Sequence, residues 1–185
     1  MRIIAGRLRR RPLRAPRGYL TRPTSDRTRE SLFNLLESRV ALDGADVLDL
    51  FGGTGALGLE AVSRGAQAVT FVEQQSRVLK YARQNAADLE VADVCWFLRA
   101  DAVGYLERYS GPPYDVIFAD PPYDLEAMAR LPGLALPHVK PHGAFVLEHD
   151  KRISFEGHPN LDTSRSYGRT LVSVFLPGAK AEDDG

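Results

Sequence analysis

Beginning at Asp46, short apolar segments alternate with amphipathic segments of helical length, and this alternation is what most constrains the fold. The apolar segments are expected to be strands, because each is brief and nearly continuous in apolar residues, as buried parallel strands are. A chain that alternates in this way forms a parallel sheet with helices on both faces. The expected strands are 47–51, 68–73, 94–100, 114–120 and 143–149, and the expected helices are 56–64, 76–89 and 102–109.

The carboxyl-terminal part breaks this alternation. Residues 165–168 are expected to form a turn, and a strand over 170–176 follows without an intervening helix. A strand reached without a long crossover pairs antiparallel with its neighbour. The sequence therefore predicts an α/β fold with a seven-stranded, mostly parallel sheet and an antiparallel C-terminal strand. This combination favours a methyltransferase-type doubly wound sheet over the sheet of a dinucleotide dehydrogenase.

Residues 1–24 are expected to form a basic arm or short β-hairpin, and residues 25–185 a single compact domain. Gly6, Pro12, Pro16 and Gly18 interrupt regular structure within the arm. An amphipathic helix of about a dozen residues is expected to follow, with residue 25 or 26 as its N-cap.

Basic charge is concentrated in the same region, although the whole chain carries 24 basic and 24 acidic residues. Residues 1–30 contain ten arginines and only two acidic residues. A guanidinium matches phosphate geometry better than an ammonium does, so nucleic acid is the expected partner, with a merely solvated arm as the alternative. The arginines expected to bind it are Arg2, Arg7, Arg9, Arg10, Arg11, Arg14, Arg22 and Arg27.

Several classes of protein are excluded by composition. No apolar run approaches the roughly 18 residues that cross a bilayer, and the first residues lack a signal-peptide core, so no membrane association and a cytoplasmic location are expected. A single cysteine, Cys95, cannot form an internal disulfide or a thiolate zinc cluster. His138 and His142 have helical spacing, but adjacent prolines oppose a helix there, so no metal is expected.

The glycine loop at residues 52–55 follows the first expected strand, at the edge where open α/β sheets bind ligands. Its glycines match a dinucleotide fingerprint, and Glu73 lies 20 residues beyond Gly53, so the loop alone fits NAD and S-adenosylmethionine equally. Asp49 favours S-adenosylmethionine, because a carboxylate repels pyrophosphate and attracts the ammonium of a methionine moiety. Glu73 would bind the ribose hydroxyls and Asp101 the adenine amine. The other residues expected to bind the cofactor are Phe51, Gly52, Gly53, Thr54, Gly55, Gln74 and Ala102.

The segment Asp120, Pro121, Pro122 and Tyr123 comes directly after a strongly apolar strand and carries the sharpest chemical signal. The two prolines build a rigid corner that donates no backbone hydrogen bonds. The lone pair of an exocyclic amine is delocalised into its base, so an enzyme that methylates it must accept both N–H groups. Asp120 and the Pro121 carbonyl are the expected acceptors, and Tyr123 can stack on a base swung out of its helix. His149, at the end of the fifth expected strand, would line this pocket or be a structural or solvent-exposed histidine.

These motifs resemble the Rossmann-like class I methyltransferases that carry D/N-P-P-Y/F/W. The segments RIIAG at 2–6, RPTSDRTRESLFN at 22–34 and LDLFGGTGALGLEA at 48–61 are similar to those of RsmD-type bacterial 16S rRNA guanine-N2 methyltransferases. The resemblance extends from residue 2 to about residue 149; Gly53 and Tyr123 replace the family's more usual alanine and phenylalanine. It implies methylation of the N2 amine of a guanine in 16S rRNA, free or in an assembling 30S subunit, with the basic arm holding RNA phosphates. It also implies that residues 24–34 fold over the cofactor pocket. The protein is expected to be a monomer.

Alternative functions remain open from sequence. A DNA adenine or cytosine amino-methyltransferase uses the same Asp-Pro-Pro-Tyr motif, but 185 residues leave no room for the usual target-recognition domain. A non-catalytic RNA-binding module would not need an intact Asp120, and a dehydrogenase is opposed by Asp49. Arg27 and Arg29 fit these functional roles and ion pairs with Asp26 or Glu30 on their own helix equally well.

Overall fold

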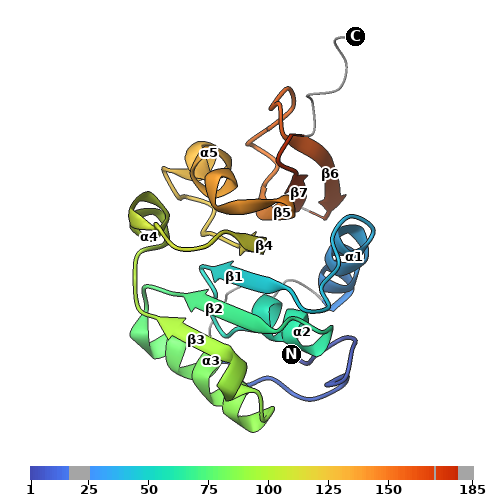
Figure 1. Cartoon of the computed structure of the whole chain (residues 1–185), viewed down its shortest axis with the longest axis vertical. Coiled ribbons are helices and arrows are strands. Elements are labelled where there is room, and N and C mark those ends of the chain that lie inside the picture. The colour runs from blue at the N-terminus through green and yellow to red at the C-terminus, as the bar shows by residue number, and fades with distance from the viewer. Residues whose placement is uncertain (17–25, 169, 179–185) are drawn as a thin grey trace.

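The structure, a computed structural model, describes residues 1–16, 26–168 and 170–178 and contains one seven-stranded sheet flanked by helices (Figure 1). The strands are β1 (Asp46–Leu50), β2 (Ala68–Val72), β3 (Cys95–Leu98), β4 (Tyr114–Ala119), β5 (Val139–Asp150), β6 (Leu161–Tyr167) and β7 (Thr170–Phe175). The helices are α1 (Asp26–Glu37), α2 (Ala56–Ser63), α3 (Ser76–Asp88), α4 (Ala102–Arg108) and α5 (Leu131–Ala135). Short 3₁₀ turns lie at Ala92–Val94, Met128–Arg130 and Leu136–His138.

The strand order is β3-β2-β1-β4-β5-β7-β6. Strands β1 to β5 run parallel, while β7 pairs antiparallel with both β5 and β6. The predicted fold class, a Rossmann-like class I methyltransferase sheet, is therefore confirmed. The strand order reverses between β1 and β4, which is where open α/β sheets bind their ligands.

Two predicted boundaries are wrong near the carboxyl terminus. Residues 165–167, expected in a turn, form the end of β6, and β5 begins at Val139 rather than at Gly143. Strand β6 has the sequence LDTSRSY and lies at the sheet edge with most of its residues exposed. Because an edge strand buries so little, it needs no apolar run, and the apolar pattern could not reveal it.

Two hydrophobic clusters enclose the sheet. One holds Leu59 of α2 and Phe33 of α1 against strand residues such as Val47, and the other holds Leu106 of α4 against residues such as Leu48. Successive residues of β1 thus point into opposite clusters, as the alternation of side chains along a strand requires. Both faces of the central strands are consequently buried.

The N-terminal arm packs on the first of these clusters. Ile3, Leu8 and Leu13 are buried there, and an antiparallel bridge between Arg2 and Pro12 gives the arm its hairpin-like pairing. The expected helix forms at Asp26–Glu37. Residues 17–25 lie outside the described part of the chain, so the division between arm and domain at residues 24 and 25 stays a prediction.

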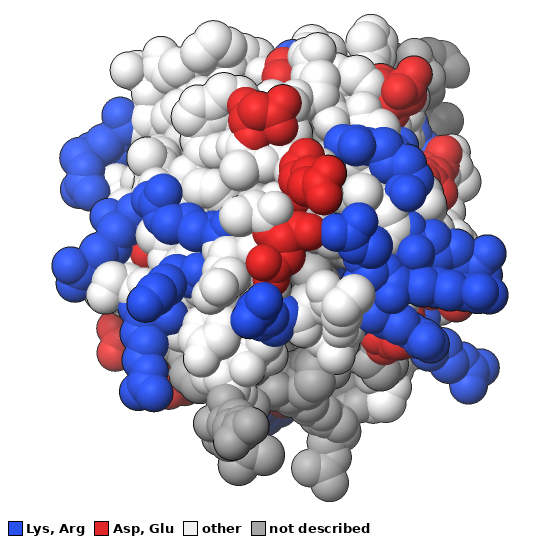
Figure 2. All heavy atoms as spheres, turned by 90° about the horizontal axis from the view of Figure 1, so that it is seen from below, with Lys and Arg blue, Asp and Glu red and all other residues white. Residues whose placement is uncertain are grey.

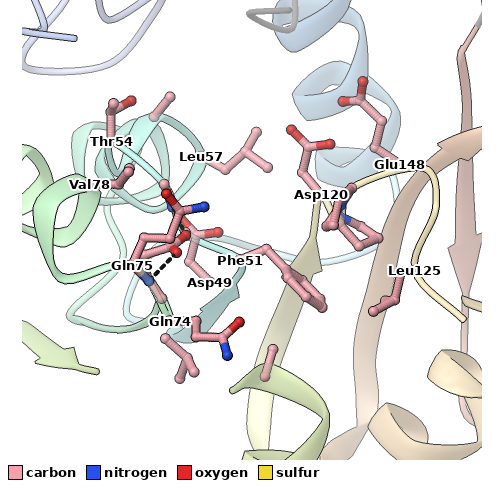
Figure 3. A pocket seen from close by; sticks show the side chains of 18 of the residues that line it. Asp49, Phe51, Thr54, Leu57, Gln74, Gln75, Val78, Asp120, Leu125 and Glu148 are labelled. Carbon is pink, nitrogen blue, oxygen red and sulfur yellow. Dashed lines mark hydrogen bonds between the residues drawn. The ribbon is translucent and has the colours of Figure 1, made fainter. Parts of the chain in front are cut away.

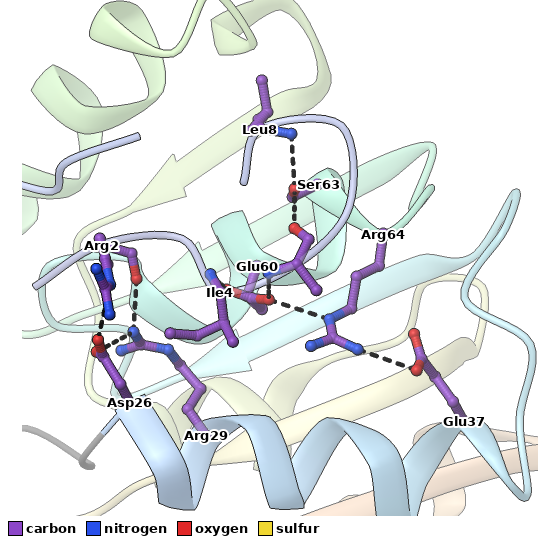
Figure 4. A network of polar contacts seen from close by, with 10 residues as sticks. Arg2, Ile4, Leu8, Asp26, Arg29, Glu37, Glu60, Ser63 and Arg64 are labelled. Atoms are coloured by element: carbon purple, nitrogen blue, oxygen red, sulfur yellow. Dashed lines mark hydrogen bonds and ion pairs between the residues drawn. The ribbon is translucent and has the colours of Figure 1, made fainter. Parts of the chain in front are cut away.

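A buried glutamate fixes the arm to α2 (Figure 4). Glu60 accepts the backbone N–H of Ile4 at 2.7 Å and that of Ala5 at 2.9 Å, while Arg64 donates its Nε–H at 3.1 Å. Ser63 continues the contact by accepting the N–H of Leu8 at 3.0 Å. The arm is therefore anchored through its backbone, and the side chains of Arg7, Arg9 and Arg10 remain exposed to solvent.

Substitution of Gly58 tests the close packing of α2 on β2. A Cβ at this position would lie 2.4 Å from Cε1 of Phe71, so Gly58→Ala should lower the free energy of unfolding by about 1–3 kcal/mol. Gly133 of α5 has no atom within 4 Å of an added Cβ and serves as the matched control, because Gly133→Ala should leave stability unchanged or raise it. Urea unfolding measures both changes, and equal stability of the two variants would contradict the described packing.

Candidate functional site

A cavity of about 620 Å³ opens at the carboxyl edge of the sheet, around the ends of β1, β2 and β4 (Figure 3). Its size suits a nucleoside-sized ligand. The sequence-predicted residues that line it are Asp49, Phe51, Gly52, Gly53, Thr54, Glu73, Gln74, Asp101, Ala102, Asp120, Pro121, Pro122 and Tyr123. Gly55, predicted to bind the cofactor, does not line the cavity; it precedes α2 with φ 84° and packs against Leu59 and Ala82.

The glycine loop turns sharply between β1 and α2. Gly53 has φ 55° and Phe51 has φ 56°, both in the left-handed region that favours glycine. The N–H of Gly55 donates to the Gly52 carbonyl at 2.7 Å and closes the turn. This turn brings the backbone of Gly52 and Gly53 to the cavity wall, together with the side chains of Phe51 and Thr54 (Figure 3).

Asp49, at the end of β1, is only 2% exposed. Its Oδ2 accepts the N–H of Gly58 at 2.9 Å. Burial raises the pKa of Asp49 to about 7, although the Gly58 hydrogen bond opposes the shift; the nearby Glu73 carboxylate adds to it. A buried carboxyl group with such a pKa is readily ionised by a cationic ligand.

Glu73 and Asp101 follow β2 and β3 and are both held by backbone amides. Glu73 accepts the N–H of Gly53 at 3.2 Å and that of Gln75 at 2.7 Å, so its carboxylate joins the glycine loop to the start of α3. Asp101 caps α4 by accepting the N–H of Gly104 at 2.7 Å. Each carboxylate therefore has a fixed orientation at the cavity wall.

Asp120 comes directly after β4 and points into the cavity (Figure 3). It retains some solvent contact through the mouth, but the surrounding protein removes most of its hydration. This burial raises the pKa of Asp120 well above its usual range, and the carboxylates of Glu148 and Asp49 raise it further. The hydroxyl group of Tyr123 shares a hydrogen bond with Oγ1 of Thr170 at 2.7 Å, which fixes one edge of the aromatic ring.

Arg29 lines the cavity but was predicted only as one of several alternatives. Its Nη2 donates to the Arg2 carbonyl at 2.6 Å and to Asp26 at 3.1 Å, which confirms the ion pair with Asp26. The side chain is 1% exposed, and burial lowers its pKa. Among the residues that the structure describes, its Nε and Nη1 have no hydrogen-bond partner. Arg29 lies on the same buried face of α1 as Leu32 and Phe33. An arginine on an apolar helix face was the sequence signal that could have indicated a functional role for Arg29.

Glu148 is a second lining residue that the sequence analysis missed. It lies near the end of β5 and is 6% exposed. An acidic residue directly after the apolar run at 144–147 was the available signal. Its position beside Asp120 makes the cavity strongly acidic.

Within residues 1–16, the six arginines of the arm have exposed side chains, and Figure 2 shows Lys and Arg gathered on two flanks of the face that it draws. Arg2 pairs with Asp26 at 3.0 Å, while Arg11 and Arg14 bond to the carbonyl and carboxylate of Asp88. Within the described ranges, no side-chain hydrogen bond or ion pair holds Arg7, Arg9 or Arg10. Arg27 is exposed on α1, and Arg22 lies outside the described residues.

Several other candidate residues belong to the core or to the surface. His149 is 1% exposed and bonds through Nε2 to Oγ of Ser173 at 2.8 Å, so it serves the core rather than the pocket. Cys95 is buried. Among residues 1–16, 26–168 and 170–178, no group of three or more acidic, histidine or cysteine side chains is arranged for a metal. In the same part of the chain, no helix has the length and apolar character needed to span a membrane.

Comparison with known proteins gives consistent matches along the chain. The family model described as Conserved hypothetical protein 95 matches residues 1–176. A Ribosomal RNA small subunit methyltransferase D from Haemophilus influenzae is 32% identical over 155 residues, which cover 82% of this chain and 79% of the relative. The protein of the same name from Escherichia coli K12 is 41% identical over 123 residues, which cover 66% of this chain and 60% of the relative.

A solved structure agrees with these sequence matches. The Escherichia coli protein yhhF superposes with a TM-score of 0.83 at 30% identity, over 97% of this chain and 98% of that one. The family match extends past residue 149, where the resemblance seen in the sequence motifs ended. The chain therefore belongs to the Conserved hypothetical protein 95 family, the RsmD-type methyltransferases.

Proposed function

We propose that this protein uses S-adenosylmethionine to methylate the exocyclic N2 amine of a guanine in 16S rRNA. The observation that carries the proposal is that Asp120 and Pro121 share one cavity with the glycine loop, with the carboxylate at the end of β1 and with those that follow β2 and β3. An acceptor for an amine and a binding site for a nucleoside cofactor thus face the same space.

The residues of the cavity fit this cofactor. The Nε–H and Nη1–H groups of Arg29 would donate hydrogen bonds to the carboxylate of the methionine moiety. Asp49 would bind the ammonium group of the same moiety. Glu73 would accept the ribose hydroxyls, since a carboxylate can accept more bonds than the two backbone amides provide. Asp101 and Ala102 would border the adenine at the start of α4.

When bound, the cofactor would supply an electrophilic methyl group; the C–S bond to its sulfonium sulfur would break as the amine nitrogen takes the methyl group, and a neutral thioether would be left. Asp120 and the Pro121 carbonyl accept the two N–H groups of the amine, and these bonds turn the nitrogen lone pair away from the base ring. Once the new N–C bond has formed, the nitrogen loses a proton, and Asp120 is the base in contact with it. A carboxyl group with a raised pKa is suited to receive that proton. Tyr123, steadied by Thr170, would stack on the base.

The RNA substrate is supported by family membership and by the arm. Two relatives are named for the small-subunit ribosomal RNA, and the arm presents Arg7, Arg9 and Arg10 to solvent. We propose that the substrate is 16S rRNA within an assembling 30S subunit and that the protein acts as a monomer. The DNA amino-methyltransferase alternative has no support among these relatives.

The direct test incubates the purified protein with methyl-labelled S-adenosylmethionine and 30S particles that lack the modification. Digestion of the RNA should yield labelled N2-methylguanosine. Label in duplex DNA instead, with none in ribosomal RNA, would overturn the proposed substrate.

Removal of the Asp120 carboxylate should abolish catalysis without abolishing cofactor binding. Asp120→Ala should lower kcat by about 10²–10⁴-fold, because an acceptor aligned with the reacting amine is lost, while Kd for S-adenosylmethionine changes only a few-fold. Single-turnover assays and calorimetry measure the two effects. Asp124→Ala, on the same loop and exposed, is the control that should retain activity. Equal loss of binding and turnover in Asp120→Ala would contradict the assigned role.

The protonation of Asp49 makes the stability of the protein depend on pH. The raised pKa of Asp49 means that the folded protein keeps this proton up to about pH 7, whereas the unfolded chain releases it near pH 4. The contribution of Asp49 to stability is therefore complete in acid and is lost as pH rises from about 4 to about 7.

Asp49→Asn keeps an acceptor for Gly58 but removes the titration. At pH 8 it should be more stable than the unsubstituted protein by on the order of 1–3 kcal/mol, and it should bind S-adenosylmethionine more weakly. Urea unfolding between pH 4 and pH 8 measures the first effect, with the exposed Asp93→Asn as control. Parallel stability curves for Asp49→Asn and the unsubstituted protein would disprove the linkage.

The arm should supply electrostatic affinity for RNA. Replacing Arg7, Arg9 and Arg10 with alanine should weaken RNA binding and reduce the slope of log K against log salt by about two, because fewer counterions are released. Titrations at several salt concentrations measure this slope. Arg130→Ala removes an exposed arginine paired with Glu107 and should leave the slope unchanged. An unaltered slope in the triple variant would mean that the arm is only solvated.

A further inference from the structure

Glu148 and Asp120 form a pair of carboxylates at the carboxyl edge of the sheet. Strands β4 and β5 pair in parallel, with Ala119 opposite Leu147, so Asp120 and Glu148 are the next residues on neighbouring strands. Both side chains line the cavity, and Figure 3 shows their carboxylates side by side and directed the same way. The pair is a consequence of register and does not depend on a flexible loop.

Two carboxylates in such an enclosure favour a ligand that brings several N–H donors. Buried carboxylates lose hydration, and like charges at close range disfavour one another. Arg29 is the one basic side chain among the described residues that line the cavity. A base with a row of adjacent N–H groups could donate to both carboxylates at once.

The nucleobases differ in whether the ring nitrogen beside the exocyclic amine carries a hydrogen. The N2 amine of guanine lies beside N1–H, so guanine offers a ring donor next to its exocyclic donors. The N6 amine of adenine lies beside N1, and the N4 amine of cytosine beside N3, and both ring nitrogens are acceptors. A carboxylate next to Asp120 would therefore bond to guanine and would meet a lone pair in adenine or cytosine.

We propose that Glu148 determines the base specificity of this site by accepting the N1–H of guanine while Asp120 accepts the N2 amine. The proposal rests on the proposed function, since it assigns the choice of guanine within the same site. The Asp-Pro-Pro-Tyr motif by itself requires only an amine in the substrate. A contact from Glu148 would explain how the enzyme acts on one base only.

The probe is 2-aminopurine, which keeps the N2 amine but carries an acceptor in place of N1–H. Small subunits would be reconstituted with 16S rRNA that holds guanine or 2-aminopurine at the nucleotide located by the labelling experiment. The unsubstituted protein should prefer guanine by about 10–100-fold in kcat/KM, the range expected when a hydrogen bond to a charged group is lost.

Glu148→Gln should lower kcat/KM on guanine and bring its ratio to 2-aminopurine close to one, because an amide both donates and accepts. Glu126→Gln, an exposed substitution of the same kind near the cavity, should retain the original preference. Unchanged binding of S-adenosylhomocysteine to Glu148→Gln, measured by calorimetry, would show that the site is folded.

Each outcome has a distinct meaning. Equal rates of methylation of guanine and 2-aminopurine by the unsubstituted protein would overturn the proposal that the site recognises the N1–H of guanine. A preference that survives in Glu148→Gln would overturn the role of Glu148. No methylation of guanine-containing subunits by the unsubstituted protein would instead overturn the proposed function.

Discussion

The parallel pairing of β1 with β4 places Asp49 and Asp120 at one edge of the sheet, where the strand order reverses. Both faces of these strands are buried in the two hydrophobic clusters, so the backbone at the edge is fixed by the core. The acidic residues that follow the strands cannot move away from one another. Burial at this edge raises the pKa of Asp49 and of Asp120, and neighbouring carboxylates add to both shifts.

This crowding of carboxylates is costly in the empty protein and useful with ligands present. A buried acid with an elevated pKa releases its proton when an ammonium or an amine approaches. Arg29 adds a buried cation with unpaired N–H groups to the same cavity. The buried charged groups of the cavity therefore lower the free energy of unfolding of the empty protein, and bound ligands that pair with these groups would raise it.

The arm depends on a second fixed contact, between its backbone and α2. Glu60 accepts two backbone amides of the arm, and Gly6 passes so close to Ser63 that an added Cβ would lie 1.9 Å from the carbonyl oxygen. Arg29 bonds to the Arg2 carbonyl, so the arm also touches the cavity wall. Through these contacts the proposed RNA-binding surface and the proposed active site share one rigid support.

The sequence by itself determined the parallel sheet, the glycine loop and the position of Asp120 after β4, because buried parallel strands require apolar runs and sharp turns require glycine and proline. It did not reveal β6, whose exposed edge imposes no apolar pattern. It also did not assign Arg29 and Glu148 to the cavity. The role of each depends on which segments lie beside it: Arg29 on the contact of α1 with the arm, and Glu148 on the register of β5 against β4. Only tertiary structure decides such neighbours, because they are remote in sequence and are brought together by packing of the whole core.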